Sequence, residues 1–567
     1  MLGKIISSNK LTVQTVVSAC IANHIKQVVI CPGSRNAPFS IAFDNHPDIK
    51  TFVIHDERSA AFFALGLIDE LNEPVALVCT SGSAVQNFAP AVSEAYYREL
   101  PLIVISADRP QSWIDQGDGQ TIRQENVLKD HVRYFLDLTD DQTSEEYQWY
   151  VKRELNTAFL HALNDWRGPI HINIGLHEPL YETTEIANVP FQKTIEIPLT
   201  PILTHETKEM ISQDLSAKIL VLCGQMPANN KLQELLVRFS LNVNVAILVE
   251  NTSNVSHPNF VHCIDRTLNM ISADRLVEFK PDVLITLGGA VVSKKIKTFL
   301  RKFSPNKHWK IGHSFPYMDT YQCATHIFKM NPEAFFGQIN ELDFSKNTIN
   351  YSGLWCQKDI LARDKSAEIF DQLPFSDLRV FDLIFQHIPS DVILHMANSS
   401  VVRYCQLFDP IKGIEYRGNR GTSGIDGSSS TAAGASVANA GKLHVLITGD
   451  VSFFYDSNAL WNSYLGQNFL VILLNNAGGG IFRIIPGPST SPQRDNFFEA
   501  THVTEAKGIC ESYHVNYQSA DTLENCQIAF QNFFTPSSNG RPKLIEIKTP
   551  REENAAVLDA YFSYIKS

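Results

Sequence analysis

Short apolar runs alternate along this chain with longer helical stretches, and this alternation constrains the fold more than any other feature. The pattern is typical of βα units and parallel sheets. The runs fall into three clusters, and the less regular stretches 180–205 and 345–375 between them are predicted linkers. We therefore expect an α/β fold of three consecutive doubly wound domains with mainly parallel sheets, over residues 1–182, 200–345 and 370–567. The apolar runs are 28–30, 75–78, 102–105 and 170–174; 219–222, 245–249 and 283–287; and 392–394, 445–447, 470–474 and 544–547.

Length and composition support this division. A chain of 567 residues is too long for one hydrophobic core. Its 44% hydrophobic and 19% charged residues are typical of a globular protein. No apolar run approaches the roughly 20 residues needed to span a bilayer. Lys4, Asn9 and Lys10 interrupt the beginning of the chain, so we expect no signal peptide.

The cysteines indicate the redox compartment of the protein, and the net charge indicates which classes of ligand it can bind. The ten cysteines form no CxxC pair and no zinc-like spacing, which predicts reduced thiols in a cytoplasmic protein. The formal net charge of −12 argues against nucleic-acid binding. An anionic substrate would therefore need a local group of cationic side chains.

Polar residues follow two apolar strands of the last cluster. Asp450 comes directly after the strand at 445–447, and Asn476 and Gly478 come after the strand at 470–474. Mg²⁺ prefers oxygen ligands and is usually shared between one or two protein groups, phosphate oxygens and water. A carboxylate, an amide carbonyl and an unhindered glycine carbonyl together predict a site for a hard cation against a diphosphate. The alternative is a pair of ordinary βα loops. Cys510, His502 and His514 follow this region and receive no role.

The loops after the first strands carry further candidates. Ser34 and Arg35 follow the strand at 28–30, and Arg35 offers a planar fork for carboxylate or phosphate. A plain Pro-Gly turn is the alternative there. Glu57 precedes a largely apolar helix, where it could simply be an acid favoured by the helix macrodipole. The turn 80–83 is rich in hydroxyl groups, and Arg109 follows the strand at 102–105.

Taken together, these segments resemble the thiamine diphosphate-dependent decarboxylase superfamily. Within it they are most similar to the 2-succinyl-5-enolpyruvyl-6-hydroxy-3-cyclohexene-1-carboxylate synthase family of menaquinone biosynthesis. Two departures from the superfamily signature are visible: Val451 replaces a glycine, and the spacing from Asp450 to Asn476 is about one residue short. The motifs are Pro32–Arg35, His55–Phe62, Thr80–Ala84, Ala107–Pro110, Gln120–Ile122, Asn398–Ser399 with Arg403, Asn419–Gly427 and Gly478–Phe482.

The resemblance implies a cofactor, a metal and a catalytic acid. The cofactor is thiamine diphosphate, held through Mg²⁺, with Mn²⁺ as the alternative, by Asp450, Asn476 and Gly478. Glu57 is implied as the catalytic acid that activates the pyrimidine ring, and Ile425 as the apolar residue that keeps the cofactor bent. The remaining cofactor contacts are implied at Ser81, Gly82, Ser399, Val451, Ser452, Gly479, Ile481 and Phe482.

The same resemblance implies the reaction and the substrate contacts. The family decarboxylates 2-oxoglutarate and adds the succinyl unit to isochorismate in a 1,4-fashion. Isochorismate contacts fall on Ser34, Arg35, Arg109, Gln120, Lys294 and Lys295. Contacts on the succinyl side fall on Ser399, Arg403 and Arg420, with an apolar wall of Ile481, Phe482 and Ile485. Gly119 stands where the family often has Asn, and Lys295 where Arg is common.

Domain roles and assembly are implied in the same way. The first domain would bind the pyrimidine and the third the diphosphate of a cofactor shared between two subunits, so at least a homodimer is expected, or a dimer of dimers. The central domain would be Rossmann-like, but it has no GxGxxG and we expect no nucleotide there. Two alternatives remain: another thiamine enzyme of the acetolactate-forming type, and a non-catalytic relative acting as a scaffold.

Overall fold

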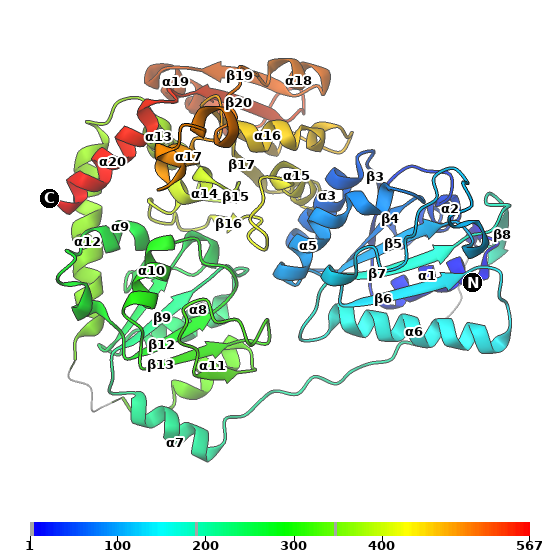
Figure 1. Cartoon of the computed structure of the whole chain (residues 1–567), viewed down its shortest axis with the longest axis horizontal. Helices are drawn as coiled ribbons and strands as arrows, with labels where there is room; N and C mark the ends of the chain where they lie inside the picture. Colours follow the sequence, from blue (N-terminus) through cyan, green and yellow to red (C-terminus); the bar gives the residue numbers. More distant parts are fainter. Residues whose placement is uncertain (1–4, 187–190, 345–348) are drawn as a thin grey trace.

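The protein consists of three α/β domains, each built on a six-stranded parallel sheet (Figure 1). The computed structural model describes residues 5–186, 191–344 and 349–567. In Figure 1 the first domain is blue to cyan, the central domain green and the third domain yellow to red. This architecture confirms the predicted fold class, whereas the predicted domain boundaries stay a prediction. No helix among the described residues is both long and apolar enough to cross a membrane.

The first sheet has the strand order β3-β2-β4-β5-β7-β6. Successive residues of a strand point to opposite faces, and Val28 and Val29 accordingly belong to different cores. Helices α1, α2 and α6 cover one face, and α3 and α5 cover the other. A small antiparallel pair, β1 and β8, lies beside this domain. The elements are β1 Ile5–Ser8, α1 Leu11–Ala22, β2 Gln27–Ile30, α2 Ala37–Asp44, β3 Lys50–Val53, α3 Glu57–Leu71, β4 Val75–Cys79, α4 Ala84–Asn87, α5 Ala89–Arg98, β5 Leu102–Asp108, β6 Tyr134–Thr139, α6 Glu145–Leu163, β7 Ile170–Gly175 and β8 Thr183–Ile186.

The central sheet has the order β11-β10-β9-β12-β13-β14, the 3-2-1-4-5-6 arrangement of a Rossmann fold. Its elements are α7 His205–Asp214, β9 Ile219–Cys223, α8 Asn230–Phe239, β10 Val245–Val249, β11 Phe260–Val261, α9 Ile264–Asn269, β12 Val283–Leu287, α10 Lys294–Lys302, β13 Lys307–Ile311, β14 His326–Phe328 and α11 Pro332–Ile339.

One predicted linker contains a long helix. Helix α12 spans Tyr351–Phe370, and its Tyr351 and Trp355 side chains are buried in the central core. The stretch is therefore an integral part of the packing, because Tyr351 and Trp355 lie one helical turn apart and enter the same core. Residues 345–348 of that stretch lie outside the described residues, as do 187–190 of the other predicted linker.

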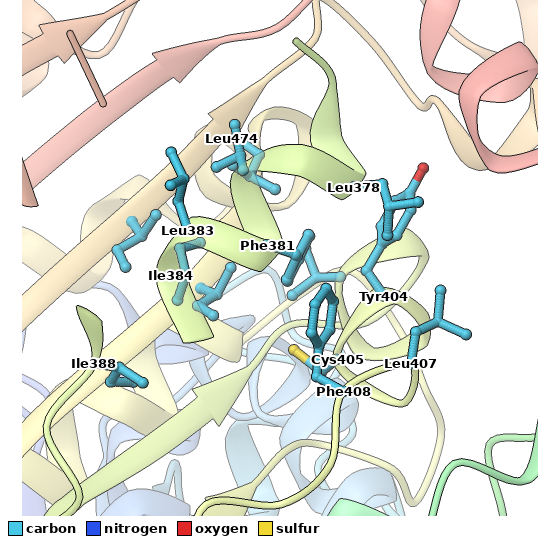
Figure 2. Packing of buried hydrophobic residues seen from close by; sticks show 14 of the residues in the cluster. Leu378, Phe381, Leu383, Ile384, Ile388, Tyr404, Cys405, Leu407, Phe408 and Leu474 are labelled. Carbon is cyan, nitrogen blue, oxygen red and sulfur yellow. The ribbon is translucent and has the colours of Figure 1, made fainter. Parts of the chain in front are cut away.

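The third sheet has the order β16-β15-β17-β18-β20-β19. Its outer face carries a dense apolar core in which Phe381 stacks on Tyr404 at 5.2 Å between ring centroids (Figure 2). The elements are α13 Asp377–His387, β15 Val392–Met396, α14 Ser400–Cys405, β16 Glu415–Arg417, α15 Ser428–Ala438, β17 Leu443–Gly449, α16 Asp450–Tyr455, β18 Phe469–Asn475, α17 Ile481–Ile484, α18 Lys507–Ser512, β19 Asn516–Ala520, α19 Leu523–Phe533, β20 Lys543–Lys548 and α20 Glu553–Lys566.

Helices α3 and α15 join the first and third domains into one core. A Cβ added at Gly66 of α3 would lie 2.0 Å from the Thr431 carbonyl oxygen, and one added at Gly434 of α15 would lie 2.0 Å from that of Phe63. Only glycine therefore allows the two backbones to approach so closely. The two sheets share the hydrophobic cluster around this crossing, so their strand ends are fixed relative to each other.

Candidate active site

Asp450 is the first residue of α16, directly after β17, and its carboxylate is buried. One carboxylate oxygen accepts the backbone N–H of Gly478 at 2.9 Å, and the other accepts that of Val451 at 2.6 Å. These bonds tie the end of β17 to the turn after β18. Burial raises the pKa of Asp450 to about 7, although the backbone donors oppose this shift. A cation beside this carboxylate would favour its charged form.

Asn476 presents its amide oxygen to the same place. Its Nδ2 donates to Asp377 at 2.9 Å, and Asp377 also accepts the hydroxyl of Thr549 at 2.5 Å. The amide nitrogen is thereby held, while Oδ1 is buried and has no hydrogen-bond partner among the described residues. A buried acceptor without a donor fits a cation ligand. The donor set of Asp450 and Asn476 therefore suits Mg²⁺.

The glycine turn after β18 needs its glycines. Gly478 has a φ of 154°, and a Cβ there would lie 2.9 Å from the Glu499 carbonyl oxygen. The Gly478 carbonyl accepts the N–H of Gly480 at 2.9 Å, which leaves its second lone pair for a ligand. The Gly479 N–H donates to Glu499 at 2.7 Å. The turn is thus held against the segment around residue 499.

Two neighbours of this site have no signal in the sequence. Asp377 begins helix α13, 99 residues before Asn476, and as a helix N-terminal acid it looks ordinary. His502 received no role, yet its Nε2 lies 3.4 Å from the Asp450 carboxylate. Only tertiary structure brings these residues to the site, since neither belongs to a recognisable motif.

Ile425 lies on the loop before α15 and is 37% exposed. Its carbonyl accepts the Ser452 hydroxyl at 2.6 Å. Asn398 holds the same loop by donating to the carbonyls of Asn419 and Gly424, at 2.7 and 2.6 Å. An exposed β-branched side chain on a fixed loop is suited to contact a ligand.

Glu57 is the first residue of α3 and is half-buried. Burial raises the pKa of its carboxyl. Its two neighbours contact the end of α16 and the segment after it in the same chain: Asp56 accepts from Asn458 at 2.7 Å, and Arg58 donates to the Tyr455 carbonyl at 2.7 Å. Glu57 is therefore held between contacts on both sides.

The turn after β4 is stabilised from within the first domain. Ser81 is buried, and Gly82 has a φ of 86°, which glycine adopts without strain. The Gly82 N–H donates to Gln124 at 2.8 Å. Gln120 lies beside it, because a Cβ at Gly82 would approach the Gln120 backbone to 3.2 Å.

Arg35 and Arg109 come together at the ends of β2 and β5. Arg35 is buried and donates to the Leu176 carbonyl at 2.9 Å. Arg109 pairs with Asp118 at 3.2 Å and donates to the Gly119 carbonyl at 2.8 Å. Both guanidinium groups thus lie at one edge of the first sheet, as their strand-end positions predict.

A second cationic group lies between the third and central domains. Arg420 is bonded to Asn398, and it interacts with Arg403, Lys297 and the buried carboxylate of Glu250. Burial raises the pKa of Glu250 to about 7. Sequence reasoning missed Lys297 and Glu250, because the resemblance pointed to neighbouring lysines instead.

The lysines implied by the resemblance lie elsewhere on α10. Lys294 is exposed at its start. The Lys295 Nζ lies 3.9 Å from the ring centroid of Phe562 and donates to Asn269 at 3.3 Å. Lys297, whose Nζ donates to the Val291 carbonyl at 2.6 Å, is the α10 lysine that interacts electrostatically with Arg403 and Arg420.

The remaining candidates lie on α14 and α17. Ser399 precedes α14 with a φ of 70°. Ile481 is buried, and Phe482 packs on Phe498 with ring centroids 6.1 Å apart. Ile485 follows them and is partly buried. Among the described residues, no hydrogen bond or ion pair joins the Arg35–Arg109 group to the Asp450 site or to the Arg403–Arg420 group.

Comparisons with known proteins define the class of this chain. Residues 11–128 match the N-terminal thiamine pyrophosphate-binding domain of thiamine pyrophosphate enzymes, residues 193–396 the middle domain, and residues 400–547 the C-terminal thiamine pyrophosphate-binding domain. The chain is thus a thiamine pyrophosphate enzyme. Benzoylformate decarboxylase from Polynucleobacter necessarius shares the fold, with a TM-score of 0.72 over 95% of this chain and 99% of that chain at 15% identity.

Curated relatives define the family more narrowly. A 2-succinyl-5-enolpyruvyl-6-hydroxy-3-cyclohexene-1-carboxylate synthase of Christiangramia forsetii is 43% identical over 98% of both chains. The synthases of Flavobacterium johnsoniae and Porphyromonas gingivalis are 42% and 38% identical, the first over 97% of this chain and 98% of its own, the second over 95% of each. This chain belongs to the 2-succinyl-5-enolpyruvyl-6-hydroxy-3-cyclohexene-1-carboxylate synthase family.

Proposed function

We propose that this protein is a transferase of class EC 2.2.1.9 in menaquinone biosynthesis. It decarboxylates 2-oxoglutarate and adds the succinyl unit to isochorismate by 1,4-addition, giving 2-succinyl-5-enolpyruvyl-6-hydroxy-3-cyclohexene-1-carboxylate. The observation that carries the proposal is the 43% identity to such a synthase over 98% of both chains. The match extends over all three domains.

Asp450, Asn476 and the Gly478 carbonyl would hold Mg²⁺, with Mn²⁺ as the alternative, and through it the cofactor diphosphate. The free Oδ1 of Asn476 supports this assignment. When bound, thiamine diphosphate supplies a nucleophilic carbon and an electron sink for decarboxylation. The other cofactor contacts are proposed at Ser81, Gly82, Ser399, Ile425, Val451, Ser452, Gly479, Ile481 and Phe482.

Glu57 is proposed to hold and exchange a proton with a pyrimidine nitrogen of the cofactor. Its raised pKa supports this role, since burial makes the carboxyl group hold a proton more readily than an exposed one does. Ile425 would keep the two rings of the cofactor bent against each other by its apolar bulk.

The two substrates are proposed to use different cationic groups. Ser34, Arg35, Arg109 and Gln120 would bind isochorismate, with Lys294 and Lys295 in a supporting role. Ser399, Arg403 and Arg420 would bind the succinyl side, against the wall of Ile481, Phe482 and Ile485. Charge-assisted hydrogen bonds to fixed arginines support recognition of dianions by an acidic chain. Lys297 joins the second group by its position.

The decisive test is product analysis. The purified protein is incubated with thiamine diphosphate, Mg²⁺, 2-oxoglutarate and isochorismate, and the product is identified by mass. We expect the succinyl adduct of isochorismate. Formation of acetolactate from pyruvate would support the acetolactate-forming alternative, and no turnover of any 2-oxo acid would support the scaffold alternative.

We also propose a cytoplasmic homodimer, or a dimer of dimers, with active sites between subunits. Mixing Glu57→Gln with Asp450→Ala subunits tests it, because a mixed dimer then carries one site with both residues intact. We expect activity to return on mixing and not in either variant alone. Absence of recovery in a verified mixed dimer would place each site within one chain.

A further inference from the structure

The segment between β7 and β8 touches the proposed isochorismate loops at three points. The Leu176 carbonyl accepts from Arg35 at 2.9 Å, and the Tyr181 hydroxyl is 2.8 Å from that of Ser34. Between them, Glu178 directs its carboxylate toward two arginines. This segment lies outside every motif found in the sequence.

Glu178 places one oxygen between the two guanidinium groups. Its Oε1 lies 3.2 Å from Nη2 of Arg35 and 3.9 Å from Nη1 of Arg109. The Glu178 side chain is 72% exposed, whereas those of Arg35 and Arg109 are 6% and 20% exposed. A carboxylate between two arginines offers the same chemistry as a carboxylate of a bound substrate.

The two arginines do not depend on Glu178 for their positions. The Leu176 carbonyl holds Arg35, and Asp118 together with the Gly119 carbonyl holds Arg109. Glu178 is by contrast exposed, and these two arginines are the only ion-pair partners that the described residues give it. Its removal should therefore leave both guanidinium groups in place.

We propose that Glu178 is a placeholder carboxylate that occupies the isochorismate carboxylate position in the free enzyme and is displaced when the substrate binds. The inference rests on the proposed function, because it takes Arg35 and Arg109 as the isochorismate arginines. Glu178 then sets specificity: a ligand must offer a carboxylate that competes with an internal one. Because an exposed ion pair is weak, the competition lowers isochorismate affinity by a factor of about two to five.

The test compares Glu178→Gln with Glu182→Gln in the enzyme loaded with thiamine diphosphate and Mg²⁺. Glu182 undergoes the same change of charge nearby, but its carboxylate contacts Asn9 and not the arginines. We expect Glu178→Gln to lower the KM for isochorismate about two- to fivefold, with kcat and the KM for 2-oxoglutarate unchanged. Glu182→Gln should change none of them. Thermal melting verifies that both variants are folded.

The outcomes separate this inference from the proposed function. If Glu178→Gln leaves the isochorismate KM unchanged or raises it while the succinyl adduct still forms, the placeholder is refuted and the proposed function stands. If Arg35→Ala and Arg109→Ala both leave that KM unchanged, no carboxylate position exists between them and the placeholder also fails. If the wild-type protein forms no adduct, the proposed function fails first.

Discussion

The first and third domains are built on the same topology and carry different chemistry. Numbered in chain order, the strands of both sheets follow the arrangement 2-1-3-4-6-5. The strand ends of the first domain carry Glu57, the first residue of α3, and two arginines, whereas those of the third carry a buried carboxylate and a free amide oxygen. Topology fixes where a strand ends, but the loop sequence decides what it can bind.

The central domain sharpens this contrast. Its sheet has the Rossmann order, yet the loops after its strands carry neither the pair of residues proposed to bind the metal nor a GxGxxG phosphate motif. Its proposed contribution is instead Glu250 and Lys297, which face the arginines of the third domain.

The largest expected effect is a loss of turnover when Glu57 of the first domain is replaced. Glu57→Gln should lower kcat roughly 10²- to 10⁴-fold, because an amide cannot exchange the proton. Thiamine diphosphate and Mg²⁺ should still bind, since the proposed diphosphate and metal contacts lie in the third domain. Steady-state kinetics with calorimetry of cofactor binding provides the measurement. Near wild-type turnover at saturating cofactor would remove Glu57 from the mechanism.

The next prediction separates the substrates between the domains. Arg35→Ala should raise the KM for isochorismate roughly 10- to 100-fold, the expected loss of charge-assisted hydrogen bonds, and change that for 2-oxoglutarate little. Arg403→Ala should do the reverse. Substrate-saturation curves for both variants provide the measurement, and equal impairment of both substrates in each would contradict the division.

A smaller effect tests how the third domain holds its metal ligand. Asp377→Ala should free the Asn476 amide to rotate and weaken Mg²⁺-dependent binding of thiamine diphosphate about 10- to 100-fold, as for other residues behind a metal ligand. Asp377→Asn retains a carbonyl acceptor and should lose less. Calorimetric titration over a range of Mg²⁺ concentrations measures both. An unchanged affinity in Asp377→Ala would mean that the amide is held by other groups.

The last prediction concerns stability, and it tests the packing of α3 of the first domain against α15 of the third. Gly434→Ala should destabilise the protein by about 1–3 kcal/mol, because the new methyl group overlaps the Phe63 carbonyl. Gly508 of α18 provides the matched control, since a Cβ there meets nothing within 4 Å. Denaturant unfolding compares the variants, and equal stability of the two would show that the helices can separate without cost.

Much of this architecture follows from the sequence, because buried parallel strands form continuous apolar runs. The run at 28–30 is β2, and the run at 470–474 lies within β18. Strands β13 and β16 were not predicted. Within Lys307–Ile311 and Glu415–Arg417, charged residues interrupt the apolar ones, so neither segment forms a continuous apolar run. Helix α12 escaped because its turns lie within a stretch that has no regular apolar pattern.

The candidate site also contains residues that the sequence predicts and residues that it does not. Asp450 and Asn476 were predicted because each follows a strand that the pattern shows. Asp377, Glu178 and His502 were not, because each acts through a partner distant in the chain or outside a motif. Local residue types reveal which groups could bind, whereas their supporting contacts depend on the folded backbone.

The contacts of Asp377 also indicate when the candidate site is completed during synthesis and folding. Its carboxylate is held by Thr549 and its backbone N–H by the Asn554 side chain, both in the segment that follows the last strand, β20. Synthesis delivers this segment after the strands of all three sheets, and the earlier domains can begin to fold before it. The side chain that orients the Asn476 amide is therefore fully held only once the segment after β20 has been synthesised and folded.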